Sequence, residues 1–134
     1  MKIAICGSMS FAKEMIDLKK DLEKKGHKVI IPDEAEKHLG GKITEQDKWE
    51  KLKFNVFKKY FNEIKNSDAI VVININKNNV KGYIGGNSLI EMAFAHVLDK
   101  KIFLTCEIPK IAYSQEIKAM KPIVLRKDLG NLKN

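Results

Sequence analysis

Apolar residues follow two alternating patterns along the chain: short continuous runs and longer stretches with helical spacing. The runs are rich in β-branched residues and have the length of buried strands. They are KIAIC (2–6), HKVIIP (27–32), DAIVVINI (68–75), KIFLT (101–105) and PIVL (122–125). The near-continuous apolar character of DAIVVINI is typical of the interior of a parallel sheet.

Stretches with helical periodicity lie between these runs. In residues 10–26 the pattern predicts a helix with Ser10 as N-cap and Gly26 as its stop. Further helices are predicted over about 44–66, 87–100 and 114–120. The polar segment from Asp33 to Lys42 predicts a loop, which either closes over a ligand on Gly40 and Gly41 or is plainly disordered.

The alternation of strands and helices predicts the fold class. Five strands with helical connections indicate an α/β three-layer sandwich of the flavodoxin or Rossmann-like kind, with a five-stranded parallel sheet in the order 2-1-3-4-5. A length of 134 residues fits one domain, so residues 1–134 are taken as a single domain.

The predicted helix over 44–66 carries an unusually wide apolar face. Its apolar positions cover an arc of about 200°, which is more than a helix packed on one sheet requires. A second buried surface, and hence a homodimer, is the simplest interpretation, although a broad core-facing helix in a monomer would show the same pattern. These positions are Trp49, Leu52, Phe54, Val56, Phe57, Tyr60, Phe61 and Ile64.

Composition and charge narrow the function classes. Hydrophobic residues make up 44% and charged residues 31%, which is typical of a soluble globular protein. No run is long enough to span a membrane, and the start of the chain lacks the pattern of a secretory signal, so a cytoplasmic protein is expected. The net charge of +8 suggests nucleic acid, but it comes from lysines interleaved with acids and a single arginine, Arg126, and this disfavours a nucleic-acid partner.

Metal and cofactor chemistry is not indicated. His27, His38 and His96 show no spacing typical of a metal site, and the sequence has neither a P-loop nor a GxGxxG fingerprint. Cys6 and Cys106 are isolated and are expected to be buried, reduced thiols. We therefore expect no metal and no cofactor.

The predicted topology places a ligand crevice where the winding of the sheet reverses, beyond the carboxyl ends of strands one and three. CGSMS (6–10) follows strand one, and the loop and helix start from Lys77 to Glu91 follow strand three. Both are rich in residues whose backbone N–H groups bind anions, so a small anionic or sugar-bearing ligand is expected. The candidate binding residues are Gly7, Ser8, Met9, Ser10, Tyr83, Gly85, Gly86, Asn87 and Ser88.

Glu91 has two interpretations. Ser88 and Glu91 have the spacing of a capping box, which stabilises a helix by about 1 kcal/mol and needs no function. The same carboxylate would also lie in the first turn of a helix at the crevice, where the helix dipole favours its ionised form. A fixed, ionised carboxylate can attack a sugar carbon as a nucleophile.

Three segments resemble the nucleoside 2-deoxyribosyltransferase family, which includes the deoxynucleoside 5′-monophosphate N-glycosidases. They are KIAICGSMSF (2–11), SDAIVVIN (67–74) and the loop running into EMAFAHVLDKKIFLT (91–105). The resemblance implies that Glu91 attacks C1′ of a nucleoside or nucleoside 5′-monophosphate and forms a glycosyl-enzyme ester. It also implies that Gly7 and Ser8 line the sugar or phosphate end of the pocket.

The chain departs from the family at the residues that assist the nucleophile. Tyr60 stands where the family has a second acid, and Ala4 or Ile5 stands where it has a tyrosine. Gly85 replaces the aspartate of the transferase members. Asp68, which opens strand three, is interpreted as a structural turn residue.

Tyr60 and Tyr83 are the candidates to hydrogen-bond the Glu91 carboxylate instead, although packing is the commoner role of a tyrosine. Two functions follow: an enzyme acting through Glu91, and a non-catalytic module that binds a nucleotide or related metabolite in the same crevice.

Overall fold

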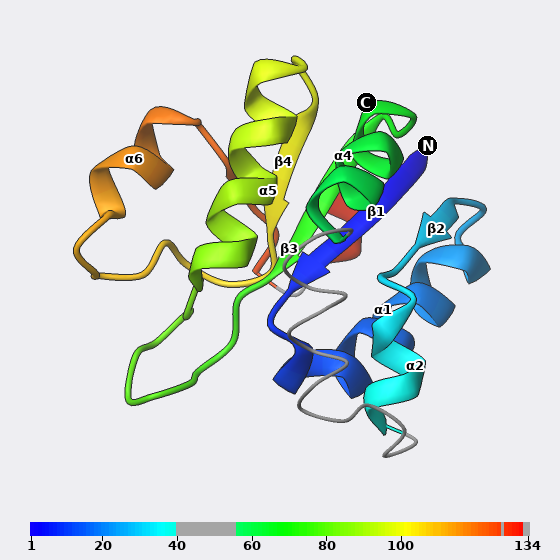
Figure 1. The fold of residues 1–134 in the computed structure, drawn as a ribbon, viewed down its shortest axis with the longest axis horizontal. Coiled ribbons are helices and arrows are strands. Elements are labelled where there is room, and N and C mark those ends of the chain that lie inside the picture. The colour runs from blue at the N-terminus through cyan, green and yellow to red at the C-terminus, as the bar shows by residue number, and fades with distance from the viewer. Residues whose placement is uncertain (40–55, 127, 133–134) are drawn as a thin grey trace.

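The computed structural model describes residues 1–39, 56–126 and 128–132. Five strands form one parallel sheet in the order β2-β1-β3-β4-β5, with helices on both faces (Figure 1). The strands are β1 (Lys2–Gly7), β2 (Lys28–Ile30), β3 (Ala69–Ile73), β4 (Lys101–Leu104) and β5 (Ile123–Val124). The predicted α/β class and strand order are confirmed.

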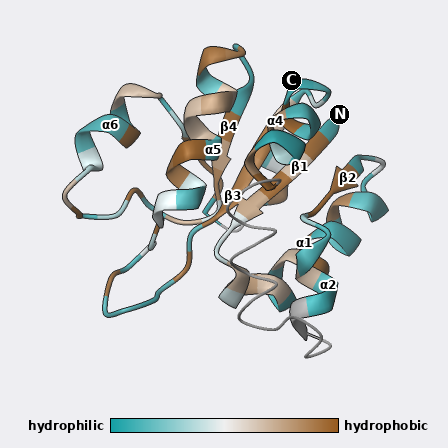
Figure 2. Cartoon of the chain, in the orientation of Figure 1, coloured by the Kyte–Doolittle hydropathy of each residue, from teal (hydrophilic) through white to brown (hydrophobic). Residues whose placement is uncertain are grey.

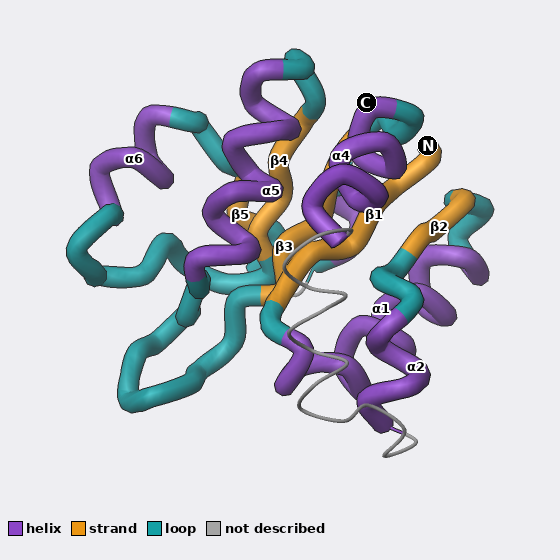
Figure 3. The backbone as a smooth tube through the Cα atoms, viewed as in Figure 1, coloured by secondary structure: helices purple, strands orange, loops and turns teal. Residues whose placement is uncertain are grey.

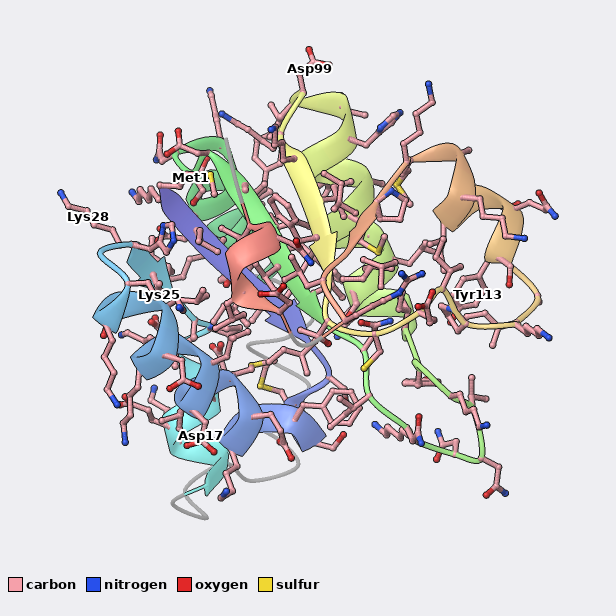
Figure 4. The ribbon with its side chains drawn as sticks, turned by 180° about the vertical axis from the view of Figure 1, so that it is seen from behind. Met1, Asp17, Lys25, Lys28, Asp99 and Tyr113 are labelled. Carbon is pink, nitrogen blue, oxygen red and sulfur yellow. The ribbon has the colours of Figure 1, made fainter. Side chains whose placement is uncertain are left out.

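Helices fill the connections between the strands. They are the 3-10 helix η1 (Met9–Phe11), α1 (Ala12–Lys24), α2 (Glu34–Leu39), α4 (Phe57–Lys65), α5 (Gly86–Val97), α6 (Ser114–Ala119) and the 3-10 helix η3 (Leu129–Asn131). Helices α4 and α5 lie against one face of the sheet, and α1 and η3 lie behind the other (Figures 1 and 4). The three layers follow from the sheet being apolar on both faces.

The side chains of β1 alternate between the two cores. Ile3 and Ile5 belong to the core on the α1 side, whereas Ala4 and Cys6 belong to the core with α4 and α5. This two-residue alternation is the normal period of a strand, and both sets are fully buried. The central strands are accordingly among the most apolar parts of the ribbon (Figure 2). Cys6 therefore faces α5, which carries Glu91.

The start of α1 differs from the prediction. Ser8, not Ser10, is the N-cap: its Oγ accepts from the Ser10 backbone N–H at 3.3 Å, and it caps η1 rather than α1. The helix α1 then begins at Ala12. The predicted stop is confirmed, because Gly26 follows the helix with φ of +91°, a conformation that glycine adopts readily.

Two other predicted turns have different outcomes. The predicted loop from Asp33 to Lys42 is wrong in its first part, because Glu34–Leu39 form α2; its glycines, Gly40 and Gly41, lie outside the described residues. The structural role predicted for Asp68 is confirmed: its carboxylate accepts from the Lys2 backbone N–H at 2.8 Å, and its own N–H donates to the Lys2 carbonyl at 2.7 Å. This pair ties the amino ends of β1 and β3.

The predicted helix over 44–66 is described only in its second half, as α4. Trp49, Leu52 and Phe54 lie outside the described residues. Along the described part, Tyr60 and Ile64 are buried, whereas the half-buried Phe61 packs edge to face on Phe94 of α5, with ring centroids 5.2 Å apart. The homodimer stays a prediction.

The charged surface mixes both signs where the structure describes it. Lys13 pairs with Asp17 at 3.2 Å, and Lys25 is exposed. The labelled side chain of Lys28 points outward from the β2 edge (Figure 4). The expectation that nucleic acid is not a partner stays a prediction. None of the helices in the described part of the chain has the length and apolar character needed to cross a bilayer.

Candidate functional site

The candidate site lies at the carboxyl ends of β1 and β3, the two strands from which the chain winds in opposite directions. Gly7 ends β1 and pairs with Ile73, which ends β3. A Cβ on Gly7 would lie 3.2 Å from the Met15 side chain and 3.3 Å from the Ile73 carbonyl oxygen. The close packing of α1 and β3 on β1 therefore explains why a glycine stands at position 7, and a ligand contact is not needed to account for it.

Ser8 leaves β1 in an extended conformation and begins the first turn. Its hydroxyl is hydrogen-bonded to the Ser10 hydroxyl at 2.9 Å, and its carbonyl accepts from the Phe11 backbone N–H at 2.9 Å. Ser10 is exposed, whereas Met9 packs against the core on the α1 side. Of the predicted residues in this segment, the two serines present polar atoms beyond the strand.

The segment between β3 and α5 reaches out from the sheet and returns to it (Figure 3). The fully buried side chain of Asn74 holds its base: the amide donates to the carbonyls of Cys106 and Glu107, both at 3.0 Å, and accepts from the Cys106 N–H at 2.9 Å. Gly82, whose φ is +70°, also lies close to the residues that follow β4. The segment is thus fastened to the residues after β4.

A tight turn at the tip of this segment positions Lys77. Backbone hydrogen bonds join Lys77 and Val80 in both directions, at 3.1 and 2.9 Å. Asn78 and Asn79 between them have φ of 53° and 61°, the left-handed pair that a type I′ turn requires and asparagine tolerates. The sequence Asn-Asn between two extended residues was the signal in the sequence for this turn. It gave no indication of which groups the Lys77 side chain contacts.

The Lys77 ammonium returns to the first segment. It donates to the Ser8 hydroxyl at 2.8 Å. It also lies 5.9 Å from the centroid of the Phe11 ring and 5.4 Å from that of the Tyr83 ring, within range of cation–π attraction. The structure therefore joins the two predicted segments through a residue that was not among the predicted binding residues.

The start of α5 contradicts the capping box. The helix begins at Gly86 with Gly85 as N-cap, and no side chain caps it. Ser88 is the third helical residue and Glu91 the sixth, so the pair lies too far into the helix for a cap. Gly86 and Asn87 are exposed, Ser88 is buried, and Tyr83 lies over Gly85, whose added Cβ would come 3.2 Å from the tyrosine oxygen. Glu91 is therefore not a capping residue.

Glu91 is buried in the core between α5 and the sheet. Its exposed fraction is 7%, and it is the only acidic residue among the buried residues in the described ranges. Burial raises the pKa of its carboxyl from 4.5 to about 8, because a carboxylate loses hydration there. The group is held neutral at pH 7 in the ligand-free protein.

Cys6 is the side chain that opposes this effect. Its fully buried thiol forms a side-chain hydrogen bond with the Glu91 carboxyl, which lowers the pKa of the glutamate. The pKa of the thiol is raised well above its usual value by burial, and further by the Glu91 charge and this hydrogen bond. A thiol that donates to a carboxylate stabilises both the carboxylate and its own neutral form, so it lowers the pKa of the carboxyl and raises that of the thiol. Cys6 was expected to be a buried, reduced thiol, and only the alternation along β1 could have indicated that it faces α5.

Tyr60, one of the two candidates to hydrogen-bond Glu91, has backbone acceptors instead. Its buried hydroxyl donates to the backbone carbonyl of Ile5 and also lies 3.3 Å from that of Ile30, so the hydrogen bond expected with Glu91 is replaced by bonds that join α4 to β1 and β2. Burial, with Cys6 and Glu91 nearby, raises the pKa of Tyr60 well above its usual value. It remains a neutral phenol beside the site. In the described ranges, no three His, Cys, Asp or Glu side chains gather into a group that could hold a metal ion.

Two solved structures share this arrangement of strands and helices. The 2-deoxyribosyltransferase of Bacillus psychrosaccharolyticus aligns with a TM-score of 0.55 and 23% identity, over 78% of this chain and 71% of that one. The chain has the fold of these nucleoside enzymes. The CMP N-glycosidase BcmB of Clostridium botulinum aligns with a TM-score of 0.53 and 19% identity, over 95% of this chain and 91% of that one. No protein-family model matches the sequence, and a search of curated proteins gives no significant match.

Proposed function

We propose that this protein cleaves or exchanges the N-glycosidic bond of a nucleoside or nucleoside 5′-monophosphate, with Glu91 as the nucleophile. The observation that carries the proposal is a buried carboxyl on α5, hydrogen-bonded to a thiol near the carboxyl end of β1. Two solved structures with this fold are a 2-deoxyribosyltransferase and a CMP N-glycosidase, which supports the proposal.

In the proposed reaction, the ionised Glu91 carboxylate attacks C1′ of the sugar as the bond from C1′ to the base nitrogen breaks. The base leaves with the bonding electron pair and takes up a proton from solvent, and the sugar remains attached to Glu91 as an ester. Water or a second base then attacks C1′ and releases the carboxylate. Positive charge develops on the sugar in the transition state, and an anionic Glu91 in a poorly hydrated site stabilises it.

The raised pKa of Glu91 determines how much of the reactive carboxylate is present at a given pH. Because the carboxyl is neutral below about pH 8 in the ligand-free protein, the reactive anion is the minor form at pH 7. The Cys6 thiol favours that anion, and this is the assistance that the described residues provide in place of the family's second acid.

The raised pKa also favours a second candidate function. A neutral carboxyl can donate a hydrogen bond to a bound sugar or base without reacting, so the same crevice would serve a non-catalytic module that binds a nucleotide or related metabolite.

Base release distinguishes the two functions. Ribo- and deoxyribonucleosides and their 5′-monophosphates are incubated with the protein at pH 7 and pH 8.5, and free base is separated by chromatography. Glu91→Gln is compared with Glu116→Gln, an exposed glutamate of α6. We expect release by the wild type and by Glu116→Gln, and at least about a hundredfold less by Glu91→Gln. If the wild type releases base from none of the substrates, or if Glu91→Gln releases as much base as the wild type, the catalytic role is refuted.

A further inference from the structure

The outer face of α5 lacks the charged side chains that cover α1. Among Lys, Arg, Asp and Glu, α5 contains only the buried Glu91, whereas α1 exposes lysines and acids along its whole length. Of the three large hydrophobic side chains that are exposed in the described ranges, two belong to α5: Ile90, exposed to 40%, and Val97, exposed to 78%. A helix that is apolar on its solvent side is typical of a surface that another molecule covers.

The exposed apolar residues of α5 form one stripe. At 100° per residue, Ile90, Phe94 and Val97 lie within an arc of about 60° on the helix, and we call these three residues the α5 stripe. Met92 and Ala95, which are fully buried, face the sheet on the other side of the helix. The α5 stripe therefore points away from the core and is not needed for the packing of α5 on the sheet.

The apolar surface continues from α5 onto α4. The two helices lie side by side on one face of the sheet, and Phe61 of α4 packs on Phe94 (Figure 1). The groove between them is lined by Phe57, Lys58, Phe61, Asn62 and Phe94. With 12 residues in α5, the two helices present a face about 18 Å long and about 20 Å wide. Covering it removes on the order of 500 Å² from water on each partner, at the small end of specific interfaces.

The order of residues along α5 favours a second copy of the chain as the occupant. The midpoint between Ile90 and Val97 falls between Ala93, which is exposed, and Phe94. When two α5 helices pack antiparallel about a two-fold axis at this midpoint, Ile90 of one copy lies opposite Val97 of the other. The same axis places the large Phe94 opposite the small Ala93. The outer face of α5 is thus complementary to itself, as a two-fold interface requires.

The net charge points to the same occupant. Two copies that each carry a charge of +8 repel each other, so they approach closely only through a surface with few lysines. The α5 stripe contains none, and Lys58 is the one lysine among the residues that line the groove. An acidic partner would instead be attracted to the lysine-bearing faces. A copy of this chain needs no charge complementarity to bind at α5.

We propose that the α5 stripe and the groove beside it form the interface of a homodimer in which two α5 helices pack antiparallel about a two-fold axis. This interface is centred on α5, whereas the homodimer predicted from the sequence was based on the helix over 44–66. It does not depend on the reaction at Glu91, whose side chain is buried. Because the interface is small, we expect a dissociation constant in the micromolar range.

Sedimentation velocity of the full chain from about 5 to about 500 μM tests the interface. We expect the mass to rise with concentration from 15.3 kDa to twice that value, and added sodium chloride to favour the dimer because it screens the repulsion between the copies. Val97→Glu places a carboxylate at two points of the interface and should raise the dissociation constant at least about tenfold. Ile123→Glu, at an exposed apolar residue of β5, is the matched control and should dimerise like the wild type.

Mixing two variants tests the antiparallel arrangement. Ile90→Lys and Val97→Glu should each be monomeric alone, and circular dichroism shows whether each is folded. Their mixture should form dimers, because the two-fold arrangement places the new lysine opposite the new glutamate. A wild type that stays monomeric at every concentration, which would leave the face to another partner, overturns the proposal. So does a Val97→Glu variant that dimerises as tightly as the wild type. If the mixture does not restore the dimer, the antiparallel pairing is wrong.

Discussion

The buried carboxyl of Glu91 predicts that the folded protein loses stability as the pH rises. The pKa of the group is about 8 in the folded protein and 4.5 in an exposed carboxyl. Between these values, the folded state holds a proton that the unfolded state has lost, so the free energy of unfolding falls with pH. Below pH 4.5 both states are protonated and there is no penalty, and above pH 8 both are ionised and the penalty is complete.

The size of this effect follows from the two pKa values. A change from 4.5 to about 8 corresponds to about 5 kcal/mol at 1.36 kcal/mol per pH unit. For a domain of this size, that is a large part of the total free energy of unfolding, which is on the order of 5–15 kcal/mol. The carboxyl is therefore a substantial electrostatic liability to the fold at alkaline pH.

The substitution that tests this is Glu91→Gln, which keeps the shape of the side chain and an oxygen that accepts from the Cys6 thiol. Urea unfolding is followed by circular dichroism at pH 5, 6, 7, 8 and 9 for the wild type and the variant. We expect similar stability at pH 5 and an advantage of the variant that grows with pH, up to about 5 kcal/mol at pH 9. Titrations common to both proteins, such as that of His27, cancel in this difference.

The matched control is Glu14→Gln, because Glu14 is exposed on α1. Its difference from the wild type should stay within about 0.5 kcal/mol at every pH. A difference between wild type and Glu91→Gln that does not change between pH 5 and pH 9 would refute the reasoning, since it would mean that the carboxyl titrates normally in the folded protein.

Two further predictions concern the same region. Cys6→Ala removes the thiol that favours the Glu91 anion, so the rise of base release with pH should move to higher pH, whereas Cys6→Ser keeps a donor and should keep the wild-type profile; identical profiles for both would contradict the role of the thiol. Gly82→Ala would place a Cβ 2.5 Å from the Glu107 carbonyl oxygen at φ of +70° and should lower the free energy of unfolding by about 2 kcal/mol or more, whereas Gly86→Ala, with nothing within 4 Å, should change it by less than about 1 kcal/mol in urea unfolding. Equal stability of the two glycine variants would contradict that prediction.

Sequence patterns were sufficient for the sheet because each strand is a continuous apolar run. The interior of a parallel sheet requires such runs, and the crossover rule then leaves few strand orders. The capping box of Ser88 and Glu91 was predicted wrongly for a physical reason: the Ser-x-x-Glu spacing fits a cap, but the N-cap of α5 is Gly85, three residues before Ser88, and the helix buries both side chains. Burial thus changes the chemistry of Glu91 from an ionised surface cap to a neutral core carboxyl.

The remaining site residues depend on contacts between segments that are distant in the sequence. Lys77 and Ser8 are 69 positions apart and meet only because the turn at Asn78 and Asn79 directs the lysine back across the end of β1. Tyr60 was one of two candidates to hydrogen-bond Glu91, but the backbone carbonyls of Ile5 and Ile30 are its acceptors. Local patterns contain no information on which of several polar groups a long or rigid side chain reaches.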